Sequence, residues 1–148
     1  MQESQELIEQ YQRTYPDISR WLVETVEEAR HQGYVETLLG RRRYVPTINA
    51  SNRIERSFAE RVAVNMPIQG TQADMIKIAM VNIHRRMREE GLKSKMLLQV
   101  HDELVFEVPP EEEPAMRHLI EEEMINALPL DVPVEVDVNA GNNWLDAH

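Results

Sequence analysis

Residues 99–107 decide how the second half of the chain folds, and they read Gln99-Val100-His101-Asp102-Glu103-Leu104-Val105-Phe106-Glu107. Apolar, strand-forming residues precede and follow a polar tip of one imidazole and two carboxylates. Such runs predict two paired strands over 95–108 that are joined by a tight turn. A turn held by a buried hairpin is a rigid place from which to present a carboxylate to a metal ion. A plain hairpin, polar at its turn because turns face water, is the alternative interpretation.

Length and composition limit the class of protein. A chain of 148 residues, 42% of them hydrophobic, can bury the core of one globular domain. No run of 18 apolar residues predicts a transmembrane helix, and the first residues lack the pattern of a secretory signal. The absence of cysteine excludes disulfides and thiolate metal sites. We therefore expect a cytoplasmic protein, with no membrane partner.

The net charge of −10 is unevenly distributed along the chain. Residues 30–100 carry thirteen Lys and Arg against six Asp and Glu, whereas residues 101–148 carry thirteen acids and one base. A basic face can attract phosphates locally, because salt screens charges that lie more than about 8–10 Å away. A solvated charged surface remains the alternative interpretation.

The sequence pattern predicts helices that alternate with short strands. The expected helices cover 4–13, 17–32, 51–64 (capped by Ser51), 67–90 after an interruption at Pro67, and 110–127. The expected strands form a hairpin over 34–45 with the basic connection Arg41, Arg42 and Arg43, a hairpin over 95–108, and a last strand over Val134–Val138. We expect an α+β fold with a small antiparallel sheet of about three strands, including a central hairpin, packed against several helices.

Arg61, Asn65 and Gln69 form a second group of candidate functional residues. They are spaced four apart, and each side chain can donate hydrogen bonds. On a straight helix they would share a face, with a drift of about 40° per step, but Pro67 weakens that argument. Donors in a DNA minor groove can test base-pair geometry without reading sequence. The alternative is structural: Asn65 as a helix N-cap and Arg61 as a surface ion-pair partner.

Four segments resemble the C-terminal part of family A DNA polymerases, the bacterial DNA polymerase I type. They are GYVETLLGRRRYVP (33–46), ERVAVNMPIQGTQADMIK (60–77), LQVHDELVFEVP (98–109) and VEVDVNAGNNWL (134–145). The resemblance covers essentially the whole chain, with the motifs in the family's order. It implies part of a polymerase palm with adjoining fingers helices: 1–50 as fingers-side helices and basic hairpin, and 51–148 as the palm portion.

The resemblance also implies roles at the hairpin tip. Asp102 matches the palm aspartate that ligates the catalytic magnesium ions, and Glu103 matches a supporting carboxylate beside it. His101 matches a residue that lies next to the primer terminus. The implied activity is that of a DNA-directed DNA polymerase, a nucleotidyltransferase of DNA replication and repair, with Mg²⁺ as cofactor.

The resemblance implies DNA contacts at the other candidate residues. Arg61, Asn65 and Gln69 match residues that contact the primer–template duplex, chiefly on its minor-groove side. The arginine connection over 41–43 is an expected phosphate contact. The implied partners are primer–template DNA and, in the complete enzyme, deoxynucleoside triphosphates.

Two parts of the family pattern are missing from this sequence. The family's other metal-binding aspartate and its nucleotide-gripping fingers helix both lie upstream in those enzymes. One aspartate and a neighbouring glutamate supply half of a two-metal site, so we expect the chain alone not to polymerise. It would be either an excised piece or one half of a split polymerase, and it would associate with the N-terminal remainder or with itself. A non-catalytic duplex-DNA-binding or protein-interaction module is the alternative function.

Overall fold

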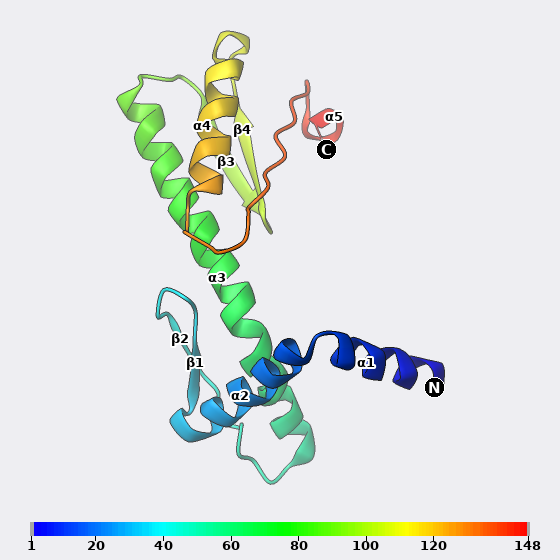
Figure 1. Ribbon diagram of the computed structural model, residues 1–148. Helices are drawn as coiled ribbons and strands as arrows, with labels where there is room; N and C mark the ends of the chain where they lie inside the picture. The colour runs from blue at the N-terminus through cyan, green and yellow to red at the C-terminus, as the bar shows by residue number, and fades with distance from the viewer. Residues whose placement is uncertain (1, 148) are drawn as a thin grey trace. The chain divides into compact units, whose positions relative to one another are not determined.

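The computed structural model describes residues 2–147, with side chains from Glu6 onward (Figure 1). Two compact units divide the chain, Met1–Thr71 and Gln72–His148. The elements, in chain order, are α1 (Gln2–Thr14), α2 (Pro16–Gln32), β1 (Tyr34–Glu36), β2 (Arg42–Tyr44), α3 (Arg53–Glu89), β3 (Lys95–Val100), β4 (Glu103–Glu107), η1 (Pro110–Glu112), α4 (Glu113–Ile125) and α5 (Trp144–Ala147). None of the described helices is long and apolar enough to cross a membrane.

The first unit contains α1, α2, the β1–β2 hairpin and the first part of α3. Pro16 opens α2, and Gly33 ends it with a φ of 80° and an N–H that donates to the Ala29 carbonyl at 2.9 Å. The predicted helices and the predicted hairpin are confirmed, but the first strand is shorter than expected, and Arg42 and Arg43, predicted in the connection, belong to strand β2. The core of this unit is formed by buried apolar residues from α2, the hairpin, the following loop and α3: Ala29, Val35, Val45, Ile48, Ala59, Ala63 and Met66.

The predicted interruption at Pro67 is wrong, because α3 is one helix of 37 residues. A proline inside a helix costs about 3 kcal/mol, since it removes a backbone donor and crowds the preceding turn. Buried residues lie on both sides of it, Ala63 and Met66 before and Ile76 and Ala79 after. Packing of an apolar face is the main source of helix stability in proteins, so here it outweighs the cost of the proline.

The start of α3 also differs from the prediction. The Ile54 N–H donates to Asn52 Oδ1 at 2.9 Å, so the N-cap is Asn52 and not Ser51. The Arg56 N–H donates to the Asn52 carbonyl at 3.0 Å, which is the first hydrogen bond of the helical series. Both Ser and Asn are good N-caps, and the sequence alone did not distinguish neighbouring candidates.

The β1–β2 hairpin contacts α3 at Gly70, where a Cβ atom would lie 2.6 Å from Thr37 Cγ2. Two hydrogen bonds join the hairpin to the helix, and a third, within α3, orients the Thr71 hydroxyl. The Leu38 N–H donates to Thr71 Oγ1 at 3.1 Å, Thr71 Oγ1 donates to the Pro67 carbonyl at 2.5 Å, and the Arg41 guanidinium donates to the Gly70 carbonyl at 2.9 Å. Gly70 therefore allows a close approach of the hairpin to the helix.

The second unit packs the β3–β4 hairpin and α4 against the last part of α3. Its buried core comes from α3, α4 and the loop that follows: Ala79, Ile83, Met87, Met116, Leu119, Ile120 and Ala127. The hairpin adds Met96, Leu104 and Phe106. The antiparallel register pairs Met96 with Phe106 and Val100 with Glu103, with an irregularity between Met96 and Leu98. The predicted hairpin over 95–108 is confirmed, and so is the helix over 110–127, whose first turn is η1.

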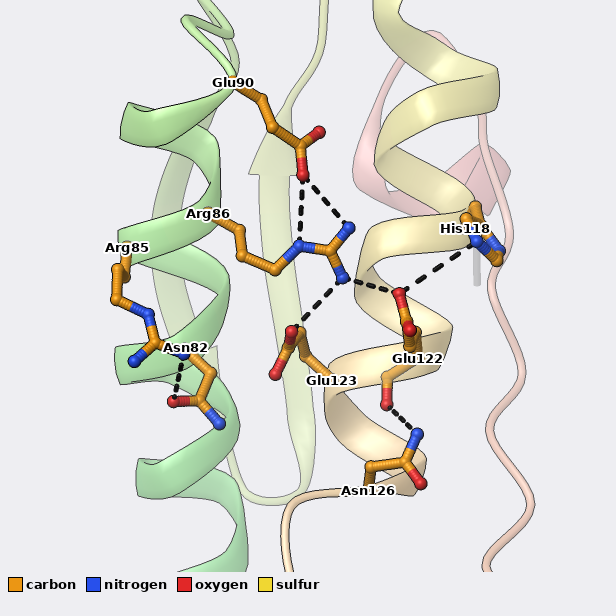
Figure 2. A network of polar contacts seen from close by, with 8 residues as sticks. All are labelled: Asn82, Arg85, Arg86, Glu90, His118, Glu122, Glu123 and Asn126. Carbon is orange, nitrogen blue, oxygen red and sulfur yellow. Dashed lines mark hydrogen bonds and ion pairs between the residues drawn. The ribbon is translucent and has the colours of Figure 1, made fainter.

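An ion-pair network joins α3 to α4 in this unit (Figure 2). Arg86 contacts Glu90 at 3.0 Å, Glu122 at 2.6 Å and Glu123 at 3.2 Å. These hydrogen bonds raise the pKa of Arg86 above its usual value, and the bond from Arg86 lowers the pKa of Glu122. Arg86 is thus neutralised by three carboxylates within the unit.

The α+β fold class is confirmed, but the predicted sheet of about three strands is replaced by two sheets of two strands each. Val134–Val138 alternates between half-buried and exposed residues as a strand would, yet it is not paired in a ladder. Among the described residues, β3 and β4 pair only with each other. The segment is held instead by the Val138 side chain, which packs against the core, and by the Arg117 guanidinium, which donates to the Val138 carbonyl.

Candidate functional site

The tip of the β3–β4 hairpin is a two-residue loop, His101-Asp102, closed by the pair Val100 and Glu103. His101 has a φ of 53°, the left-handed region that two-residue hairpin loops use. Histidine enters this region more readily than most residues, although some strain remains. The Gln99 Nε2 amide donates to the His101 carbonyl at 2.9 Å and so holds the loop from one side.

The hairpin presents both predicted carboxylates to solvent: Asp102 from the loop and Glu103 from the first position of β4. Asp102 and Glu103 are exposed, and they line an open depression of about 1440 Å³ bordered by the hairpin, α4 and residues 135–147. Other carboxylates line the same depression: Glu107, Glu113, Glu135 and Asp137. The hairpin therefore places Asp102 at an accessible tip in an acidic hollow.

Carboxylate oxygens are the ligands that Mg²⁺ prefers, so the donor type at the tip suits this ion. Within the described residues, however, no three His, Cys, Asp or Glu side chains are grouped closely enough to hold a metal. Mg²⁺ is often bound by one or two protein carboxylates together with water and substrate phosphates. Asp102 and Glu103 thus offer oxygen donors of the type that suits Mg²⁺, but they do not form a complete ligand set.

Arg61, Asn65 and Gln69 lie along the exposed side of α3 in the first unit. Because the helix continues through Pro67, successive members of this row are separated by about 40° around the axis, as the spacing predicted. Asn65 lies in the helix interior, which excludes the alternative that it is an N-cap. Arg61 lies over the Phe58 ring at 5.9 Å and forms no ion pair within the described residues. The row is therefore three accessible donors on one helical face.

The three arginines of the basic connection have different surroundings. Arg41 is bound to the Gly70 carbonyl, as described above. Arg42 contacts Glu36 at 2.6 Å and lies 4.5 Å from the centre of the Tyr34 ring, and the bond to Glu36 raises its pKa. Arg43 is exposed, and its side chain makes no hydrogen bond or ion pair with the described part of the chain. Of the three, Arg43 is thus the guanidinium most available to a phosphate.

The two halves of the predicted site belong to different compact units. His101, Asp102 and Glu103 are together in the second unit, whereas the α3 row and the arginine connection are in the first. Sequence reasoning did not assign a role to Gln99, although its position two residues before a polar turn is a signal for a side chain that can bond the turn.

Known proteins with similar sequences are bacterial DNA polymerases. DNA polymerase I, thermostable, of Thermus aquaticus is 50% identical over 146 residues, which are 99% of this chain and 17% of that protein. DNA polymerase I of Bacillus caldotenax is 48% identical over 145 residues, 98% of this chain and 16% of that protein. The chain therefore spans less than a fifth of the length of these relatives.

A solved structure shares the fold. It is the POL domain of Pol1 from M. smegmatis in complex with DNA primer-template and dNTP, with a TM-score of 0.96 and 47% sequence identity. The match covers 99% of this chain and 26% of that one. The sequence model of DNA polymerase family A matches residues 1–146. The resemblance seen in the motifs is thus confirmed, and this chain belongs to DNA polymerase family A.

Proposed function

We propose that this chain supplies part of the active site of a DNA-directed DNA polymerase. The observation that carries the proposal is the hairpin tip, which presents Asp102 on a two-residue turn at the edge of an acidic depression. Family membership supports nucleotidyl transfer as the reaction, with primer–template DNA and deoxynucleoside triphosphates as substrates. In this proposal residues 1–50 lie on the fingers side, residues 51–148 form the palm portion, and the enzyme works in the bacterial cytoplasm.

At the tip, Asp102 is the proposed metal ligand and Glu103 a supporting carboxylate. When bound, a pair of magnesium ions would activate the primer hydroxyl and stabilise the leaving pyrophosphate. His101 would lie beside the primer terminus, and its positive φ of 53° marks the turn that carries Asp102. The role of this chain is to hold these groups on a rigid hairpin.

Along α3, Arg61, Asn65 and Gln69 are the proposed contacts to the primer–template minor groove. Their exposure and their common helical face support this role. Minor-groove acceptors are similar in all base pairs, so such donors test pair geometry and do not select sequence. Arg43, with Arg41 and Arg42 beside it, is the proposed phosphate contact.

The chain alone is proposed to be inactive, because its two adjacent carboxylates leave the ligand set incomplete. Association with the N-terminal remainder of a polymerase would complete it, and self-association through exposed surfaces is the other expected assembly. Support comes from large apolar side chains that are exposed on α1, α2, α3 and the residue between α1 and α2: Leu7, Ile8, Tyr11, Tyr15, Ile18, Val23, Ile54 and Phe58. A non-catalytic duplex-binding module is the second candidate, favoured by the same incomplete metal site.

The deciding experiment mixes this chain with a matching N-terminal part of a family A polymerase and measures nucleotide incorporation on primed DNA. We expect activity only in the mixture, and a loss of at least about 100-fold with Asp102→Asn. The matched control is Asp131→Asn, the same change at an exposed residue outside the depression. Equal activity of the two variants, or incorporation by the chain alone, would contradict the proposed roles.

A further inference from the structure

The second unit carries a group of basic side chains on α3 that the proposed function does not use. Its members, which we call the basic stripe, are exposed residues of the last part of the helix: Lys77, His84, Arg85 and Arg88. At 100° per residue, Lys77, His84 and Arg88 lie within about 40° of one another around the axis, and Arg85 lies at their side. From Lys77 to Arg88 the stripe extends about 16 Å along the helix.

The stripe contrasts with Arg86, its neighbour in sequence. Figure 2 shows Arg86 turned toward α4 and its carboxylates, whereas Arg85 points to the opposite side of α3. Arg85 bonds only the Asn82 side chain, at 3.4 Å, and no member of the stripe forms an ion pair with the described residues. Glu89 follows Arg85 by four residues, a favourable spacing for a pair, yet no ion pair joins them in the described structure.

An ordinary solvent-exposed helix face, with charges of both signs, does not explain a stripe of basic residues alone. Residues three apart are neighbours on a helix surface, so the like charges of Arg85 and Arg88 destabilise the helix by a few tenths of a kcal/mol. The chain has an excess of acids, thirteen of them in residues 101–148, and none of those that the structure describes neutralises the stripe. Val81, 67% exposed, lies in the middle of the stripe and leaves its centre free of any opposing charge.

We propose that the basic stripe binds the phosphate backbone of a nucleic-acid duplex. A duplex carries one negative charge per about 1.7 Å of axis when both strands are counted, so a length of duplex that matches the 16 Å stripe carries on the order of ten phosphates, and the stripe faces one side of it. Such binding releases counterions and is independent of sequence. Lysine and arginine on one helical face suit a regular row of phosphates, and this contact is separate from the minor-groove contacts proposed above.

Fluorescence anisotropy of a blunt 20-base-pair DNA duplex, titrated with the purified 148-residue chain at several salt concentrations, tests the proposal. The variant Lys77→Gln/Arg88→Gln removes two charges of the stripe. The control Arg20→Gln/Lys95→Gln gives the same net charge but removes bases that already pair, with Asp17 and Glu107. We expect the stripe variant to bind about tenfold or more weakly near 50 mM salt, with a salt slope smaller by about two.

The control variant should stay within about twofold of the parent chain, because its charges are already paired. Equal weakening by both variants would show a general charge effect and overturn the proposal, as would unchanged binding by the stripe variant or no duplex binding at all. Displacement of the duplex by poly-glutamate at equal charge concentration would assign the stripe to acidic proteins instead. The result does not depend on Arg61→Ala, which tests the primer–template contacts, so the two proposals can fail separately.

Discussion

Gly70→Ala tests whether close packing of the β1–β2 hairpin governs the first unit. In a helix interior alanine is favoured over glycine by about 1 kcal/mol, so propensity alone predicts a more stable protein. The added Cβ would lie 2.6 Å from Thr37 Cγ2 and 3.3 Å from Met66 Cε. Extra methyl groups in a packed core cost about 1–3 kcal/mol. We therefore expect Gly70→Ala to destabilise the unit by up to about 2 kcal/mol.

Thr37 cannot easily move away from a new methyl group. Its side chain is 5% exposed, and its Oγ1 accepts from the Arg41 N–H at 3.2 Å, which holds its rotamer. Thr37→Ser removes Cγ2 and keeps this hydroxyl, so it is the matched second variant. When Gly70→Ala is combined with Thr37→Ser, the gain in helix propensity should be recovered, giving a coupling energy of about 1–3 kcal/mol between the two positions.

The free energy of unfolding can be measured by urea denaturation with Trp21, half-buried on α2, as the reporter. Trp144→Phe removes the other tryptophan, which lies in the second unit. If Gly70→Ala stabilises the unit by about 1 kcal/mol and shows no coupling to Thr37→Ser, the close approach at Gly70 does not control its stability.

Three further changes follow from single contacts. Glu112 accepts hydrogen bonds from Ser94 Oγ and the Lys93 N–H, which lower its pKa below 4.5, so its stabilisation is present above about pH 4.5 and is lost as pH falls below it. Urea denaturation of Glu112→Gln across pH should therefore show a deficit at pH 7 that disappears in acid. Asn52→Ala should lower stability by about 1 kcal/mol in thermal unfolding, whereas Ser51→Ala should have little effect. Gln99→Ala should speed amide hydrogen exchange in the hairpin loop, because the bond to the loop carbonyl is lost, while exchange in α4 stays unchanged.

Local patterns predicted the hairpins because alternating apolar runs and polar turns are encoded within a few residues. The tip at His101 is an example, since its two-residue loop follows from the strands on either side. Pro67 shows the limit of such reasoning, because burial of Ala63 and Ile76 is a tertiary effect that local propensity does not contain. Val134–Val138 shows the same limit, because alternation predicts a strand but not its pairing partner.

The candidate site was predictable in part for the same reason. The prediction that Arg61, Asn65 and Gln69 share a helical face required only a continuous helix. Because α3 continues through Pro67, the three residues do share a face. The different surroundings of Arg42 and Arg43 could not be predicted, because they depend on which residue of the opposite strand each one faces. Register pairs Arg42 with Glu36 and Arg43 with Val35, which leaves a carboxylate beside only one of them.

The exposed position of Asp102 leads to a last prediction, that folding of this chain does not require a divalent ion. The hairpin is held by Met96, Leu104 and Phe106 in the core, and no complete ligand group exists among the described residues. Mg²⁺ should then bind this chain with a Kd above the ~1 mM of weak but complete calcium sites. With a Kd of about 10 mM, 10 mM Mg²⁺ stabilises by only about 0.4 kcal/mol, or roughly 1–2 °C in Tm. Thermal unfolding in EDTA and in 10 mM Mg²⁺ measures this difference. A larger shift that Asp102→Asn abolishes would mean that this chain builds a complete metal site by itself.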